Sequence, residues 1–237
     1  MPQLKGIRLS VMKKDHINEE RLLPFAQQII EKLRSVKEIS YESSKSDTKE
    51  YCSAGKKEES GEVFSVRKIV ESILKKEMSP IDIAKIYIER IDRLDPKVKA
   101  FESYDPEYLL TQAKELECRL SSNSPVRILE SVPIGVKDIF NTKILPTQMG
   151  SPLWRGFTAG NDARTVFKMK QAGCMIAGKT VTAEFAVHTL GKTLNPYDAS
   201  RTPGTSSSGS AVATALGMVP VALGTQTAGS IIRPASF

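Results

Sequence analysis

Three short segments of the 237-residue chain carry residue types that can do chemistry together. In the first, Lys137 ends the apolar run 132–136. The second is the hydroxyl-rich stretch 204–210, and in the third Ser230 follows the small residues 227–229. A lysine that exchanges protons needs a donor and an acceptor beside it, and hydroxyl groups meet that need. The segments therefore indicate nucleophilic chemistry based on serine and lysine.

The apolar residues before Lys137 indicate how its amine could act as a base at neutral pH. A solvated lysine has a pKa near 10.4, so only about one molecule in several thousand is neutral at pH 7. Burial lowers a lysine pKa by up to about 3–5 units, which makes the amine a usable base. The residue type alone leaves a second interpretation open, in which Lys137 ends a strand and extends its ammonium into water.

Ser230 follows small residues that let backbone N–H groups approach a substrate closely. Such N–H groups form the oxyanion hole of acyl-transfer enzymes, where each contributes about 3–4 kcal/mol. The stretch 204–210 adds Ser206 and Ser207, although its composition also fits a flexible linker. Neither serine matches the Gly-x-Ser-x-Gly pattern. His188 is the only histidine near these segments, so a lysine base is more economical than a Ser-His-Asp triad.

Helices that alternate with short apolar strands from Ser65 onward predict a layered α/β fold. Ser65, Ser79 and Asp162 are the expected N-caps, and Asp95-Pro96 is expected to end the second helix. We expect helices at 65–74, 79–95, 106–120, 162–173 and 208–216, and strands at 132–136, 174–177, 218–223 and 230–232.

Composition divides the chain into three parts. Residues 1–39 are a basic extension with one amphipathic helical pattern after Asn18, and 40–62 form a linker rich in Ser, Lys and Glu. Residues 63–237 are predicted to form the main domain.

Several classes of protein are excluded by composition. Three cysteines and two histidines, widely scattered, do not predict a zinc site or a disulfide framework. No apolar run reaches the 18–20 residues of a membrane-spanning helix, and no signal peptide is visible, so we expect a cytoplasmic location. The net charge is +7, but basic and acidic residues alternate, so charge alone predicts no nucleic-acid partner.

Taken together, the three segments resemble the amidase signature family. Residues 204–234 are similar to its Gly/Ser-rich signature, which ends in Gly-Ser-(Ile/Val)-x-x-Pro, and Pro133-Ile-Gly-Val-Lys-Asp resembles its lysine motif. Ser206 and Ser230 stand 24 positions apart, as in the family pattern. The stretches 178–186 and 195–203 are also similar, and the resemblance covers about 65–237.

The resemblance implies an α/β fold with a layered mixed sheet flanked by helices, present only as its N-terminal portion. It implies that Ser230 is the nucleophile and that Ser206, at a cis peptide bond, relays the proton between Ser230 and neutral Lys137. A small-molecule carboxylic amide would be cleaved to an acid and ammonia or an amine through an acyl-enzyme, without cofactor or metal. Backbone N–H groups of Thr227, Ala228, Gly229 and Ser230 would form the oxyanion hole, with Ser207, Gln226 and Arg233 in supporting positions.

The chain also departs from the family. Gln226 stands where many members carry Asp, and Ala228 where many carry Gly. We expect Gln226 to hydrogen-bond as a neutral amide, because it cannot form an ion pair with Arg233. Family members are much longer than this chain, which predicts a truncated product.

Three other functions stay open. The glutaminase (A) subunit of a Glu-tRNA(Gln)/Asp-tRNA(Asn) amidotransferase shares the signature and would need partner subunits and tRNA; Gln226 favours a stand-alone amidase. A second alternative is a catalytically inert fragment. Finally, Gly173–Thr180 matches the phosphate-loop pattern G-x-x-x-x-G-K-[ST], although its four middle residues are apolar and strand-like. Substrate identity and oligomeric state are not encoded in any pattern that we identify.

Overall fold

The fold is described by a computed structural model for residues 63–187 and 189–237. The predicted extension (1–39), the predicted linker (40–62) and His188 lie outside these residues. The division of the chain at residue 63 therefore stays a prediction.

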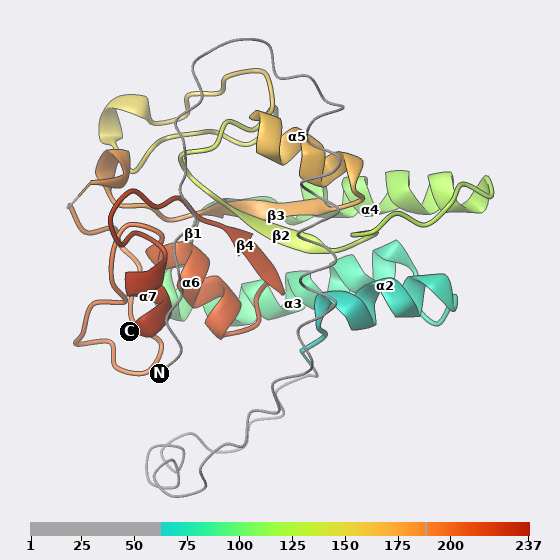
Figure 1. Cartoon of the computed structure of the whole chain (residues 1–237), viewed down its shortest axis with the longest axis horizontal. Coiled ribbons are helices and arrows are strands. Elements are labelled where there is room, and N and C mark those ends of the chain that lie inside the picture. The colour runs from blue at the N-terminus through green and yellow to red at the C-terminus, as the bar shows by residue number, and fades with distance from the viewer. Residues whose placement is uncertain (1–62, 188) are drawn as a thin grey trace, which may run out of the picture. The chain divides into compact units, whose positions relative to one another are not determined.

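Strands of the described residues form one mixed sheet in the order β1-β3-β2-β4 (Figure 1). They are β1 (Phe101–Tyr104), β2 (Pro133–Lys137), β3 (Met175–Thr180) and β4 (Val221–Leu223). Strand β2 is parallel to both β3 and β4, whereas β1 pairs antiparallel with β3. The carboxyl ends of β2, β3 and β4 therefore lie along one edge of the sheet.

The pairing of β2 with β3 contains a bulge. The register shifts by one residue between Ile134 and Gly135, because Ala177 of β3 has no partner on β2. Beyond the bulge, Lys137 lies opposite Thr180. Partners in a parallel pair share a face of the sheet, so the Thr180 side chain lies on the same face as that of Lys137.

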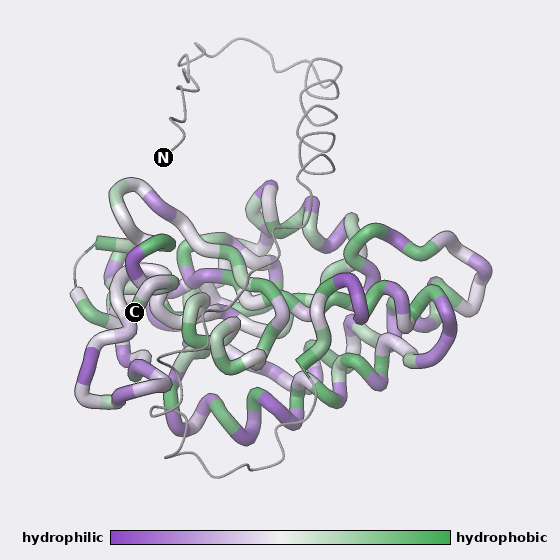
Figure 2. The backbone as a smooth tube through the Cα atoms, turned by 60° about the horizontal axis from the view of Figure 1, so that its bottom comes forward, coloured by the Kyte–Doolittle hydropathy of each residue, from purple (hydrophilic) through white to green (hydrophobic). Residues whose placement is uncertain are grey.

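Helices flank this sheet, which confirms the predicted α/β class. In Figure 1 the sheet runs between α5 on one side and α3 and α6 on the other, and α6 packs on β2, β3 and β4. Hydrophobic and hydrophilic residues alternate along the helical coils in Figure 2, as expected when one side of each helix is buried. The helices are α2 (Val66–Leu74), α3 (Pro80–Val98), α4 (Pro106–Ser121), α5 (Arg164–Gln171), α6 (Ser208–Ala215) and α7 (Ile232–Ser236), with 3-10 turns η1 (Pro152–Trp154) and η2 (Glu184–Ala186).

Capping side chains set the starts of three helices. The Ser65 hydroxyl accepts a hydrogen bond from the Lys68 N–H at 3.2 Å, and Ser79 and Asp82 form a capping box at the start of α3. Asp105 accepts from two N–H groups of the first turn of α4. These bonds satisfy N–H groups that lack a partner within the helix, and they confirm the N-caps predicted at Ser65 and Ser79.

The predicted end of the second helix is wrong. Helix α3 does not stop at Asp95-Pro96 but continues to Val98 with Pro96 inside it. The Asp95 carboxylate accepts hydrogen bonds from the N–H groups of Ala100 at 2.7 Å and Phe101 at 3.0 Å. These bonds fasten the chain just beyond the helix end.

The predicted cap at Asp162 is also wrong. Ala163 occupies the N-cap position of α5, and no side chain caps that helix. The Asp162 carboxylate instead accepts a hydrogen bond from the Lys143 N–H at 2.7 Å and forms an ion pair with Lys170 at 2.9 Å. These two contacts take the carboxylate oxygens that a cap would use.

The strand expected at 230–232 does not form. Ser230 and Ile231 lie in a turn, and α7 begins at Ile232. The Gln226 side-chain oxygen accepts hydrogen bonds from the N–H groups of Ile231 and Ile232, both at 2.9 Å. Because this side chain occupies them, these N–H groups are not available to a neighbouring strand.

Two smaller differences concern α2 and β1. Leu74 is apolar yet 58% exposed, because it is the last residue of α2. Strand β1 is not predicted by the sequence pattern, since it has only four residues and begins three positions after the last residue of α3.

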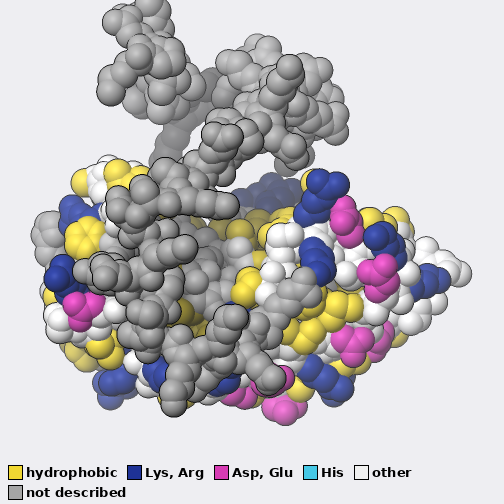
Figure 3. Space-filling model, turned by 90° about the horizontal axis from the view of Figure 1, so that it is seen from below, with side chains coloured by type: hydrophobic (Ala, Val, Ile, Leu, Met, Phe, Trp, Pro, Cys, Tyr) yellow, Lys and Arg dark blue, Asp and Glu magenta, His cyan; other side chains and the backbone are white. Residues whose placement is uncertain are grey.

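The surface and the helices bear on possible partners. Basic and acidic side chains are interspersed over the described part of the face in Figure 3. Among the described residues, no helix has the length and apolar character needed to cross a membrane.

Gly209 lets α6 approach β3 closely. A Cβ atom at this position would lie 2.3 Å from both the Ala100 carbonyl oxygen and the Val181 nitrogen. The Gly209 N–H also donates to the Val181 carbonyl at 3.1 Å. Backbone atoms cannot move aside easily, so this contact fixes the start of α6 and the loop before it.

We expect Gly209→Ala to push the start of α6 away from the sheet and to lower the free energy of unfolding by about 1–3 kcal/mol. Urea unfolding measures this change. The control is Ala215→Ser, at the exposed end of the same helix, which should stay within about 0.5 kcal/mol of the wild type. A Gly209→Ala protein with the wild-type urea midpoint would contradict the close packing.

Candidate active site

Segments that are distant in the sequence meet at the carboxyl edge of the parallel strands. Lys137 is the last residue of β2, Ser206 and Ser207 immediately precede α6, and Thr225 follows β4. In open α/β sheets, ligands bind outside the carboxyl ends of the strands. The predicted serine and lysine residues therefore lie where such a fold places its sites.

Hydroxyl groups surround the Lys137 amine. Its Nζ lies 2.7 Å from Ser206 Oγ, 2.9 Å from Ser207 Oγ and 2.7 Å from Thr225 Oγ1. The Thr225 carbonyl oxygen is a fourth neighbour at 3.4 Å. Lys137 is 0% exposed, so the interpretation in which its ammonium extends into water is wrong.

Burial shifts the Lys137 amine toward its neutral form. Its pKa falls to about 8, because the charged form loses its hydration. With this pKa, about one molecule in ten is neutral at pH 7. No carboxylate forms an ion pair with Lys137 within the described part of the chain. A neutral amine offers a lone pair, so one neighbouring hydroxyl can donate to it while the others accept its N–H groups.

Ser206 is buried beside this amine. It follows a cis peptide bond from Thr205, as the family resemblance implies. The Ser206 carbonyl accepts a hydrogen bond from the Ala183 N–H at 3.2 Å. This backbone bond ties the serine loop to the segment that follows β3, and it therefore fixes the position of Ser206.

Ser230 reaches the same loop through its backbone. The Ser207 N–H donates to the Ser230 carbonyl at 3.1 Å, and Ser230 is half-buried in the turn before α7. Within residues 63–187 and 189–237, the Ser230 hydroxyl makes no hydrogen bond to another protein group. The structure thus joins Lys137 to Ser206 directly, whereas Ser230 lies beside them without a hydroxyl contact.

The turn before α7 carries the other predicted residues. In the described part of the chain, the N–H groups of residues 227–230 have no protein acceptor, and Thr227 and Ala228 are exposed. Gln226 hydrogen-bonds as a neutral amide to the N–H groups at the start of α7. The Arg233 guanidinium donates to Thr205 Oγ1 at 3.3 Å, next to the cis peptide bond.

Sequence reasoning missed Thr225 and a second pair of hydroxyls. Thr225 makes two contacts with Lys137, and its position after a third strand was the available signal. Below the site, Thr180 Oγ1 lies 2.7 Å from Ser210 Oγ. Ser210 also donates to the Leu223 carbonyl at 2.9 Å, which links β3, α6 and β4.

The structure excludes the phosphate-loop interpretation of Gly173–Thr180. Residues Met175–Thr180 form the buried strand β3, and Lys179 is 0% exposed. A phosphate loop instead wraps its ligand with backbone N–H groups between a strand and a helix. Among the described residues, no cluster of three or more His, Cys, Asp or Glu side chains is placed to hold a metal ion.

Comparison with known families identifies the class of protein to which this fold belongs. The amidase family model matches residues 82–237, well over half of the chain. The chain therefore belongs to the amidase (amidase signature) family.

Curated relatives are glutamyl-tRNA(Gln) amidotransferase A subunits. The subunit of Acidothermus cellulolyticus is 39% identical over 170 residues, which cover 69% of this chain and 34% of that protein. The subunit of a Synechococcus species is 35% identical over 179 residues, covering 73% of this chain and 37% of that protein. The chain thus spans a little over a third of the length of these relatives.

Solved structures of amidases share the fold. The peptide amidase from Stenotrophomonas maltophilia aligns with a TM-score of 0.68 and 32% identity, covering 72% of this chain and 38% of that one. A bacterial aryl acylamidase of the amidase signature family aligns with a TM-score of 0.62 and 28% identity, covering 68% and 35%.

The lowered pKa of Lys137 predicts a gain of stability at alkaline pH. Between pH 8 and 10.5 the unfolded chain keeps a lysine proton that the folded chain has released, so the free energy of unfolding rises with pH. We expect wild-type protein to gain roughly 3 kcal/mol relative to Lys137→Met across this window. Urea unfolding at several pH values measures both proteins. Parallel pH dependences of the two would show that Lys137 keeps an ordinary pKa.

Proposed function

We propose that this protein hydrolyses a carboxylic amide to an acid and ammonia or an amine, with Ser230, Ser206 and Lys137 as catalytic residues. The observation that carries the proposal is the 2.7 Å contact between Lys137 Nζ and Ser206 Oγ. Both side chains are buried, and the pKa of the amine is lowered to about 8. Family membership supports the same reaction.

In this mechanism, Ser230 Oγ attacks the amide carbonyl carbon while Ser206 takes its proton and passes its own to neutral Lys137. A C–O bond forms, and the carbonyl electron pair moves onto the oxygen. When the intermediate collapses, the C–N bond breaks and the proton returns through Ser206 to the leaving nitrogen. Water then attacks the acyl-enzyme by the same relay. The Ser206–Ser230 hydrogen bond is expected to form with substrate in place, since catalytic hydrogen bonds tighten in the reacting complex.

The proposed oxyanion hole consists of the backbone N–H groups of Thr227, Ala228, Gly229 and Ser230. Since these groups have no acceptor in the described part of the chain, a substrate oxygen would meet no internal competitor. Donors of this kind contribute about 3–4 kcal/mol each to transition-state stabilisation.

Supporting roles fall to three further residues. Ser207 accepts from Lys137 at 2.9 Å. Gln226 holds the first N–H groups of α7, and Arg233 holds the loop at Thr205. The proposal includes a small-molecule amide substrate and a cytoplasmic location.

We expect Ser230→Ala to lower amide hydrolysis by several orders of magnitude, because it removes the attacking oxygen. Ammonia or amine release from a panel of amides, glutamine included, measures the rate. A fluorophosphonate probe should label Ser230, as mapped by mass spectrometry, and the exposed Ser200→Ala variant should behave as the wild type. Turnover that survives Ser230→Ala, or a label on another serine, would refute the nucleophile assignment.

A second candidate function is that of the glutaminase subunit of a tRNA-dependent amidotransferase. Identities of 35% and 39% to glutamyl-tRNA(Gln) amidotransferase A subunits favour it, whereas Gln226 in place of Asp favours the stand-alone amidase. A stand-alone amidase should hydrolyse amides without partners. Glutamine hydrolysis that appears only with partner subunits and charged tRNA would favour the glutaminase subunit over the stand-alone amidase. If neither condition gives Ser230-dependent turnover, the chain is inert.

A further inference from the structure

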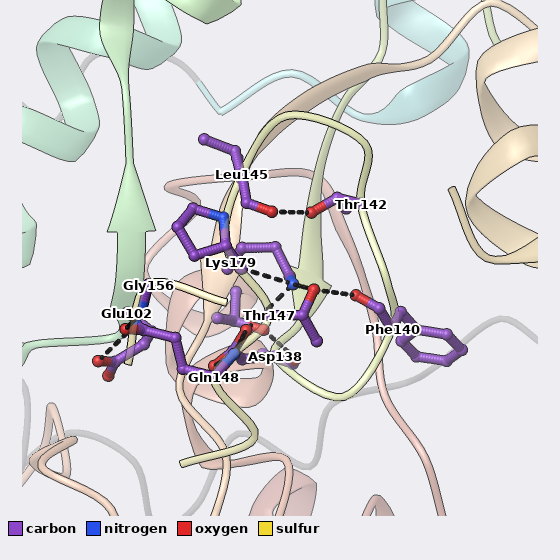
Figure 4. Close-up of polar contacts among 12 residues, drawn as sticks. Glu102, Asp138, Phe140, Thr142, Leu145, Thr147, Gln148, Gly156 and Lys179 are labelled. Carbon is purple, nitrogen blue, oxygen red and sulfur yellow. Dashed lines mark hydrogen bonds and ion pairs between the residues drawn. The ribbon is translucent and has the colours of Figure 1, made fainter. Parts of the chain in front are cut away.

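A buried ion pair lies beside the site, and the proposed mechanism does not use it. Lys179 Nζ lies 3.0 Å from Asp138 Oδ1, and both side chains are 0% exposed. Lys179 also donates to Thr147 Oγ1 at 2.7 Å and to the Pro146 carbonyl at 3.0 Å (Figure 4). An ammonium has three N–H donors, so each one has an acceptor here.

The Asp138 carboxylate is equally well satisfied. Both of its oxygens lie 3.1 Å from the Gln148 N–H, in addition to the contact with Lys179. Burial raises the pKa of Asp138 and lowers that of Lys179, while each charge favours the ionised form of the other. Removing one partner would leave the other charge buried and unpaired.

The ion pair reaches Lys137 through the next residue in the chain. The Asp138 N–H donates to the Thr180 carbonyl at 3.0 Å, and the Asp138 carbonyl accepts from the Met149 N–H at 3.0 Å. Strand β3, the loop 146–149 and the Lys179 ammonium therefore all hold Asp138. These contacts fix the end of β2, where the Lys137 side chain begins.

The same loop also supports Ser206. The Met149 carbonyl accepts from the Phe185 N–H at 2.8 Å, and two residues earlier Ala183 donates its N–H to the Ser206 carbonyl at 3.2 Å. Lys179 holds this loop at Pro146 and Thr147. One ammonium thus supports both partners of the Lys137–Ser206 contact from the opposite face of the sheet.

We propose that Lys179 is a positioning residue, which clamps Asp138 and the loop 146–149 and thereby holds Lys137 within hydrogen-bond distance of Ser206. The inference rests on the function proposed above for these two residues. Lys179 touches no reacting atom and acts through Asp138 and the loop. An ammonium suits the role, because it binds a carboxylate, a hydroxyl and a carbonyl at once.

Three variants of the intact chain test the clamp. Lys179→Met removes the charge and all three donors at similar length. The double variant Asp138→Asn/Lys179→Met also removes the unpaired buried charge, so it recovers stability without restoring the clamp. Lys170→Met is the matched control, because it removes a different lysine–aspartate ion pair. Lys170 lies on α5, and its Nζ is 2.9 Å from Asp162 Oδ2. The measurements are kcat and KM for amide hydrolysis, the Lys137 titration midpoint by side-chain NMR, and thermal unfolding.

We expect Lys179→Met to lower kcat about tenfold or more and to change KM less than about twofold, since positioning acts on the chemical step. The Lys137 midpoint should rise from about 8 toward the ordinary lysine value, because a loosened site admits water. Hydroxyls of Ser206, Ser207 and Thr225 surround this amine. The double variant should regain thermal stability but neither kcat nor the midpoint, and Lys170→Met should match the wild type.

Recovery of kcat and midpoint together with stability in the double variant would make Lys179 a purely structural residue and overturn the proposal. The same conclusion follows if Lys179→Met keeps the wild-type kcat and midpoint, or if both Lys179 variants fail to fold. If Ser230-dependent hydrolysis is not found, the proposed function fails, while the Lys137 midpoint still tests the clamp. If the activity of the chain requires Ser230 but the Lys179→Met variant keeps the wild-type kcat and Lys137 midpoint, only the inference about Lys179 fails and the proposed function stands.

Discussion

One constraint governs the site: the Lys137 amine is kept from water, and no carboxylate among the described residues pairs with it. Hydroxyl neighbours suit this situation, because each can accept from an ammonium or donate to a neutral amine. A carboxylate in their place would stabilise the charged form and raise the pKa. Asp138, the next residue, instead pairs with Lys179 on the other face of the sheet. The fold thus buries this amine while keeping a negative charge away from it.

The parallel strands bring together residues that are far apart in the sequence. Lys137, the serine loop and Thr225 come from three chain segments that end at one edge of the sheet. Helix α6 fits closely against β3 because Gly209 has no side chain. The position of Ser206 therefore follows from helix packing as much as from its own loop, and a defect in that packing would disturb its contact with Lys137.

Much of the site follows from local sequence, and the rest depends on distant partners. The motifs around Lys137, Ser206 and Ser207 predict a lysine beside hydroxyls, and the structure brings these three together. The helices that begin at Ser65 and Ser79 are likewise marked by their caps. Residue type and spacing suffice in these cases, because the interacting groups are close in sequence or belong to a known motif.

Prediction fails where two partners compete for one group. Asp162 could cap α5, but Lys143 and Lys170 bind its carboxylate. The β-branched residues after Ser230 favour a strand, yet Gln226 takes their N–H groups. In the same way, nothing local distinguishes Lys179 from a solvated lysine, since its partners are set by strand register and by a distant loop.

The unpaired residue Ala177 has a chemical consequence. If Ala177 instead paired with Gly135, the two strands would continue in simple register, and Lys179 rather than Thr180 would stand opposite Lys137. Two ammonium groups would then share one face of neighbouring strands, where like charges repel, and Asp138 would lose its partner. The bulge at Ala177 thus decides whether the Lys137 amine has an alcohol or a second cation as its neighbour.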